Sequence, residues 1–138
     1  MRILGNLRKV KAMADFLSDQ WVEELKNLGS KLPKVQGASI SCQYEISGTP
    51  EGKIRYYIVW KEGSVSEASK GKLDNPECRF TAKYDDIREI FFGRISTEEA
   101  FMRGDLKVEG DYKKFLVDLH DWRHSPKYRK LWEDLEPS

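Results

Sequence analysis

Apolar and polar side chains alternate at every position between residues 38 and 47, the pattern of a β-strand with one buried face. The apolar set comprises Ala38, Ile40, Cys42, Tyr44 and Ile46. Further strand-like runs follow over 54–60, 65–70 and 78–84, separated by turn-forming segments rich in Gly, Ser and Pro. Because these connections are short, the pattern predicts an antiparallel meander from Ala38 to Tyr84. The run over 54–60 is apolar on both faces, so we expect it to be central.

The rest of the chain shows helical spacing. Apolar residues recur every three or four positions after Ser18, a residue type that caps helix N-termini. After the strands, the pattern predicts a helix from Asp85 to Gly93 and a second one between a capping box at Ser96 and Gly104. Residues 105–109 then predict one more short strand near Leu106. Helices follow over 111–122, with Phe115, Leu116, Leu119 and Trp122 facing inward, and after Ser125-Pro126, with Tyr128, Leu131, Trp132 and Leu135 on one stripe.

Composition limits the class of protein. The chain has 138 residues, 39% hydrophobic, 34% charged and 12% aromatic, as in a soluble globular protein with a few large apolar contacts. The 24 basic and 23 acidic residues are mixed along most of the chain, so electrostatic attraction to nucleic acid is not expected. No run approaches the roughly 18 apolar residues of a membrane-spanning helix, and no signal peptide is recognisable. We therefore expect a cytoplasmic protein.

The segment from Asp74 to Leu119 carries a specific series of motifs. They are the strand Cys78-Arg79-Phe80-Thr81, the acidic cap Asp85-Asp86, an apolar helix ending at Gly93, the pair Ala100-Phe101, Gly104, and the strand Leu106-Lys107-Val108-Glu109-Gly110. In order and spacing this series resembles the C-terminal half of a sterol carrier protein domain. We expect one such domain over 1–138, with residues 1–14 as an N-terminal extension and 124–138 as a C-terminal helical extension.

The resemblance implies a fold and a function. The fold is of the α/β class, α+β type: a five-stranded, mostly antiparallel sheet, covered on one face by helices, with an apolar tunnel between the layers. The implied function is to bind, and to transfer, a hydrophobic ligand such as a fatty acid, fatty acyl-CoA or sterol. Two alternatives stay open: an accessory domain that presents a hydrophobic substrate to an enzyme, and a ligand-free interaction module that dimerises through its terminal helices.

Large apolar residues gather on the predicted helices that would cover the sheet. With the sterol carrier resemblance, they form the candidate ligand-binding set, to which Arg103 is added as a cation for an acidic headgroup. The set comprises Phe80, Ile90, Phe91, Phe101, Met102, Arg103, Phe115, Leu119 and Trp122. Met and aromatic rings suit a cavity for variable apolar ligands. Each could instead fill an ordinary core, and Arg103 could be a solvated surface charge.

No catalytic motif is recognisable: the chain lacks a nucleophile elbow, a glycine-rich phosphate loop and a dinucleotide fingerprint. The acidic pairs Asp85-Asp86 and Glu98-Glu99 lie in first helical turns, where favourable interaction with the helix dipole explains them. We therefore expect no enzymatic activity and no cofactor.

The two histidines, His120 and His124, have the four-residue spacing that places two metal ligands on one helix face. Spacing fixes no third ligand, although Asp118 and Asp121 are near, so we expect no bound metal. Cys42 and Cys78 fall on inward-facing strand positions and are expected to be buried free thiols.

Residues 1–14 combine four basic residues, no acidic residue until Asp15, and apolar residues at helical spacing. A basic amphipathic helix is typical of a transient contact with a membrane surface. The alternative is a helix that packs on its own domain or on a second copy in a homodimer.

Overall fold

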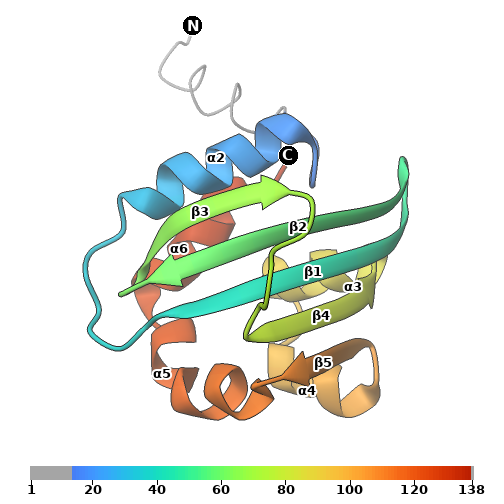
Figure 1. The fold of residues 1–138 in the computed structure, drawn as a ribbon. Helices are drawn as coiled ribbons and strands as arrows, with labels where there is room; N and C mark the ends of the chain where they lie inside the picture. The colour runs from blue at the N-terminus through green and yellow to red at the C-terminus, as the bar shows by residue number, and fades with distance from the viewer. Residues whose placement is uncertain (1–13, 138) are drawn as a thin grey trace, which may run out of the picture.

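In the computed structural model, which describes residues 14–137, a five-stranded sheet and its covering helices share one hydrophobic core (Figure 1). The elements in chain order are α2 (Asp19–Ser30), β1 (Ile40–Thr49), β2 (Gly52–Lys61), β3 (Ser64–Lys70), β4 (Cys78–Lys83), α3 (Tyr84–Phe91), α4 (Thr97–Arg103), β5 (Leu106–Gly110), the π-helical turn η1 (Lys114–Asp118), α5 (His120–Arg123) and α6 (Pro126–Leu135). The predicted fold class is therefore confirmed.

The strand order is β3-β2-β1-β4-β5, and this corrects two details of the prediction. The strands β1, β2 and β3 form the expected antiparallel meander, but β4 pairs with β1 in parallel and does not continue it from β3. The prediction of a meander through Tyr84 is wrong at this step. The central strand is β1, and not the run over 54–60 that forms β2. The short strand β5 pairs antiparallel with β4, as the pattern near Leu106 predicted.

The parallel pairing depends on a connection that crosses the sheet. Residues 71–77 run from β3 past β2 and β1 to β4, as Figure 1 shows. Because β3 and β4 are separated by three strand spacings, the connection must cover roughly 14 Å, which seven extended residues easily span. The buried amide of Gln43 on β1 holds this connection: its Nε2 donates to the Gly71 carbonyl at 3.0 Å, and its Oε1 accepts from the Leu73 amide at 2.7 Å. One polar side chain on the open face thus fixes the crossover.

The helices cover one face of the sheet and leave the other open. Paired strand residues such as Tyr44, Tyr56 and Phe80 are all buried on the covered face, where their rings stack at 4.7–4.8 Å. The next position along each strand points to the open face, which carries charged pairs such as Glu45 with Arg55. Alternation in the sequence therefore indicates the covered face of β1, β2, β4 and β5, apart from the buried polar residues Gln43 and Thr49, whereas on β3 a bulge places the buried residues Val65 and Ala68 three positions apart.

Local signals in the sequence position the helices. Side-chain oxygens of Ser18, Ser96 and Ser125 cap α2, α4 and α6, as predicted. The helix predicted over 111–122 is instead split into η1 and α5. The guanidinium of Arg123 donates to the carbonyls of Phe115 and Leu116 within this widened turn. Such π-helical turns are frequent at functional sites.

The C-terminal helix α6 is part of the core. Its residues Leu131, Trp132 and Leu135 are buried, and the Leu135 carbonyl accepts a 2.7 Å hydrogen bond from the indole N–H of Trp21 on α2. Across residues 14–137, no helix is both long enough and apolar enough to cross a membrane. The predicted basic helix over 1–14 falls almost entirely outside the described residues.

Candidate functional site

A two-part cavity lies between α3, α6 and the covered face of the sheet. The outer chamber, about 260 Å³, lies between the end of α3, the start of α4 and the helices α5 and α6. The inner chamber, about 50 Å³, reaches the sheet at Tyr44 and Phe80. Both chambers are lined by Ile90, Phe91, Thr97, Tyr128 and Trp132. The chambers are therefore adjacent parts of one site.

An aromatic stack stands at the boundary of the two chambers. The rings of Phe91 and Trp132 lie nearly parallel, with centroids 4.6 Å apart, and Tyr128 packs edge-on against Trp132 at 5.9 Å. Pockets for small ligands usually measure about 300–1,000 Å³. A long apolar ligand would therefore need this stack to part and the two chambers to merge.

Two polar groups are available in the cavity wall. Trp132 is 4% exposed, and its indole N–H, which is near the Tyr128 hydroxyl, makes no hydrogen bond of normal geometry in the described part of the chain. A buried donor without a partner costs about 1–3 kcal/mol, which a ligand oxygen would offset. Burial raises the pKa of Tyr128 to about 12, so its hydroxyl stays neutral at ordinary pH. The wall thus combines apolar rings with an unused donor.

A buried ion pair closes one side of the outer chamber. The Arg123 side chain is 3% exposed, and its Nη2 binds Oε2 of Glu98 on α4. Burial opposes ionisation of Glu98, but the hydrogen bond and charge of Arg123 outweigh it and lower the pKa of that carboxyl. The pair ties α4 to α5. Interaction with the helix dipole, the explanation offered from the sequence, is therefore incomplete for Glu98.

The structure brings together four of the residues predicted for the ligand site. Ile90 and Phe91 line both chambers, whereas Phe80 and Phe115 line the inner one. Phe115 packs edge-on against Phe80 at 4.8 Å and is 4% exposed.

The other five predicted residues lie elsewhere. Met102 is 83% exposed, and Phe101 packs beside Tyr112. Arg103 is an exposed residue paired with Glu99 and Asp105, so the structure does not bring it to the cavity as a headgroup cation. Leu119 and Trp122 line a separate depression near Val35 and Asp111.

Sequence reasoning missed several wall residues. The sequence predicts Tyr44 on the buried face of its strand, Ile87 within the helix from Asp85 to Gly93, and Tyr128 and Trp132 on an apolar stripe of a C-terminal extension, but it places none of them in the ligand site. The stripe itself was the available signal: a C-terminal helix with aromatic residues on one side needs a surface to cover. What the sequence did not indicate is that this surface includes the mouth of the cavity.

The two cysteines lie side by side on β1 and β4, and both are buried and free, as predicted. Burial raises the pKa of Cys42 well above its usual range, and that of Cys78 to about 11. Both groups are therefore protonated thiols at ordinary pH, and neither lines the cavity.

Comparison with known proteins agrees with this architecture. The model of the SCP-2 sterol transfer family matches residues 20–117. The chain belongs to this family. Sterol carrier protein 2 from Arabidopsis thaliana is 27% identical, in an alignment covering 74% of this chain and 89% of the plant protein. Lipid binding and transfer is thus the general function class.

Solved structures of the family share the fold. A crystal structure of sterol carrier protein 2 superimposes with a TM-score of 0.64 at 14% identity, covering 88% of this chain and 97% of the other. The solution structure of palmitated SCP2L2 from Aedes aegypti gives 0.56 at 18% identity, covering 77% and 94%. The family match ends at residue 117, so Arg123, Tyr128 and Trp132 in the cavity wall lie beyond it.

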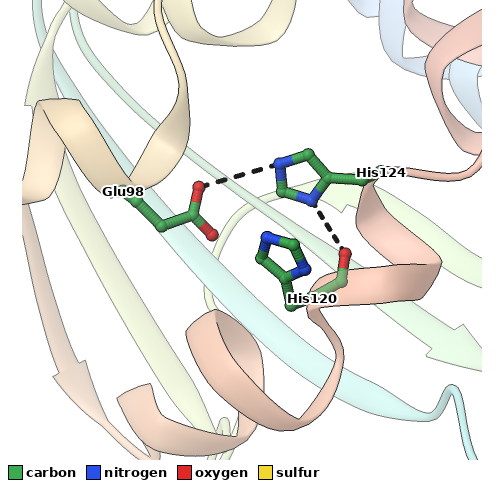
Figure 2. A group of neighbouring side chains, drawn as sticks. All are labelled: Glu98, His120 and His124. Carbon is green, nitrogen blue, oxygen red and sulfur yellow. Dashed lines mark hydrogen bonds and ion pairs between the residues drawn. The ribbon is translucent and has the colours of Figure 1, made fainter.

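A second cluster lies beside the outer chamber. Figure 2 shows Glu98 on α4 facing His120 and His124 from α5 and its end. Their potential ligand atoms all lie within 4.8 Å of one another, a spacing that a single metal ion could bridge. The structure therefore supplies, from α4, the third donor that sequence spacing did not fix.

Proposed function

We propose that this protein binds a single-chain fatty acyl ligand in the two-part cavity, with the tail in the inner chamber and an acidic headgroup in the outer one. The observation that carries the proposal is the combination, in one wall, of the Phe91–Trp132 stack and the unpartnered indole N–H. An apolar tail is favoured by about 0.8 kcal/mol for each CH₂ removed from water. A headgroup oxygen can accept from the indole.

The charges around the outer chamber favour an acid over a neutral headgroup. Arg129 and Arg123 both line it, together with one acid, Glu133. Arg123 is occupied by Glu98 and two carbonyls, whereas Arg129 is exposed on the surface of α6. We therefore assign the headgroup contact to Arg129, in place of Arg103.

A narrow inner chamber favours an acyl chain over a sterol. Tyr44, Phe80 and Phe115 enclose about 50 Å³ there, and the Phe91–Trp132 stack stands between this space and the outer chamber. A flexible chain can pass between rings that part slightly, whereas a rigid ring system requires the whole wall to move. This argument supports fatty acid or fatty acyl-CoA as the ligand class.

The experiment is a fluorescent fatty-acid titration, followed by competition with palmitate, methyl palmitate and cholesterol. Palmitate should compete best. Arg129→Gln should weaken palmitate binding by up to about 1 kcal/mol, or fivefold, because the contact is solvent-exposed. Lys130→Gln is the matched control, since Lys130 is an exposed neighbour that pairs with Asp134. Stronger competition by cholesterol, or equal losses in both variants, would overturn the assignment.

Transfer of the ligand, cytoplasmic location and contact of residues 1–14 with a membrane surface are parts of this proposal supported by the family or the sequence pattern. The accessory role beside an enzyme remains the alternative. It predicts that the isolated protein binds its ligand but does not exchange it with vesicles.

A further inference from the structure

The cluster of Glu98, His120 and His124 has the chemistry of a metal site. Two imidazoles and one carboxylate are a ligand set that zinc accepts, with a fourth position for water or another ligand. The three residues come from two separate parts of the chain, α4 and the α5 segment (Figure 2). Magnesium and calcium ions prefer oxygen ligands, so a site with two imidazole nitrogens does not suit them.

The tautomers of both histidines are set by their neighbours. His124 Nδ1 lies 2.8 Å from the His120 carbonyl oxygen, which can only accept, so Nδ1 carries the proton. His120 Nδ1 lies 3.2 Å from the Asp121 carboxylate, which likewise accepts. In both neutral rings the lone pair is then on Nε2. Metal-binding histidines characteristically donate their other ring N–H to a carbonyl or carboxylate in this way.

Arg123 orients the carboxylate of Glu98, the third donor. Arg123 binds Glu98 Oε2, while Oε1 lies 3.9 Å from His124 Nε2. The two imidazole rings stack with centroids 4.0 Å apart. Tetrahedral zinc with bonds of about 2.0–2.1 Å needs donors roughly 3.3 Å apart. Because the histidine side chains are 49% and 40% exposed, modest rotations can provide this closure.

We propose that Glu98, His120 and His124 form a binding site for one zinc ion, linking α4 to α5 beside the cavity. This replaces the expectation from sequence that no metal binds, which rested on the lack of a third ligand. Of the three ligands, His124 lies at the rim of the outer chamber and Glu98 pairs with its wall residue Arg123, whereas His120 does not line either chamber. Zinc binding and acyl binding are measured separately, and His120→Gln removes a zinc ligand without changing the cavity wall, so the two proposals can fail separately.

The test is calorimetric titration of the whole chain with zinc chloride at pH 7.5, after treatment with a chelator. The wild type should bind one equivalent. His120→Gln, His124→Gln and Glu98→Gln should each abolish this stoichiometric binding. Glu99→Gln should retain it, because Glu99 is the adjacent acid in the same helical turn and lies outside the cluster. Melting curves without metal identify any variant that fails to fold.

A second measurement follows the two histidines directly. The chain contains only these two, so imidazole ¹⁵N resonances report the site without ambiguity. Before zinc is added, both neutral rings should show the Nδ1–H tautomer, and zinc should shift both Nε2 signals together. Zinc should also raise the melting temperature of the wild type but not of the folded histidine variants. Absence of saturable binding, binding that survives both histidine variants, or a loss in Glu99→Gln would overturn the site.

Discussion

Phe115→Trp tests whether the inner chamber holds ligand. Phe115 is 4% exposed and lies edge-on to Phe80 while lining a space of about 50 Å³. The larger indole should enter that space and displace the end of an acyl tail. If it displaces about three CH₂ groups, at about 0.8 kcal/mol each, binding weakens by about 2.4 kcal/mol, or roughly 50-fold. Stability should change little, because the ring fills existing space.

The matched control is Phe101→Trp. Sequence reasoning placed both residues in the cavity wall, but the structure places Phe101 beside Tyr112 and away from both chambers. The same substitution there should leave acyl affinity unchanged. The pair thus separates an effect of the cavity from a general effect of a larger aromatic ring.

The assay combines fluorescent fatty-acid titration with thermal melting of each variant. In a solid core, Phe115→Trp would overpack and cost about 1–3 kcal/mol of stability. A destabilised Phe115→Trp protein with unchanged affinity would show that Phe115 is ordinary core. Equal loss of binding in Phe101→Trp would show that the effect does not come from the inner chamber.

Three further predictions follow from single contacts. Gly29→Ala should lower the free energy of unfolding, measured in urea, by about 1–3 kcal/mol, because the added Cβ would lie 2.3 Å from Val65 Cγ2. An unchanged urea midpoint would contradict this close packing. Burial opposes ionisation of Glu77, but its hydrogen bonds, chiefly from Lys114, outweigh this and lower its pKa below 4.5. Ionised Glu77 therefore stabilises the folded protein above pH 4.5, and this stabilisation is lost as the pH falls through the lower pKa of the folded state. The difference in melting temperature between the wild type and Glu77→Gln should shrink in acid, and a difference that stays constant would argue against this. The indole N–H resonance of Trp132, identified by its absence in Trp132→Phe, should shift when palmitate binds, whereas an unmoved signal would exclude it as the headgroup donor.

The sequence predicts which face of a strand is buried better than it predicts which strands pair with one another. Alternation identified the buried apolar face of β1, β2, β4 and β5, and serine caps marked three helix starts, because both signals are local. It did not identify the buried Gln43 or the bulge that puts Val65 and Ala68 of β3 on one face. The partner of β4 was predicted wrongly, since alternation specifies which face is buried and not which strand lies alongside. The decisive residue, Gln43, acts across 28 and 30 positions of chain, and no periodic pattern reveals such contacts.

The sequence predicts only part of the candidate site, because some wall residues are brought there by tertiary packing and not by a local pattern. Phe80, Ile90, Phe91 and Phe115 follow from the family motifs and the helical spacing, and these four do line the cavity. Tyr128 and Trp132 belong to a helix beyond the family match, and only the packing of α6 over α3 makes them part of the wall.

The cluster beside the cavity illustrates the same limit on a smaller scale. The two histidines could be paired from their spacing, but Glu98 lies more than twenty positions earlier on another helix. The Glu98 carboxylate is oriented by Arg123, which lies on α5 and binds it across the gap to α4. Only the tertiary fold brings these donors together.

The proposed function requires that the cavity hold an acyl ligand. Native mass spectrometry of freshly purified protein, with extraction and identification of the bound molecule, tests it most directly. We expect a one-to-one complex with a fatty acid or fatty acyl-CoA that is lost or strongly reduced in Phe115→Trp and retained in Phe101→Trp. A sterol as the bound molecule, or protein that stays ligand-free even after incubation with excess palmitate, would contradict it.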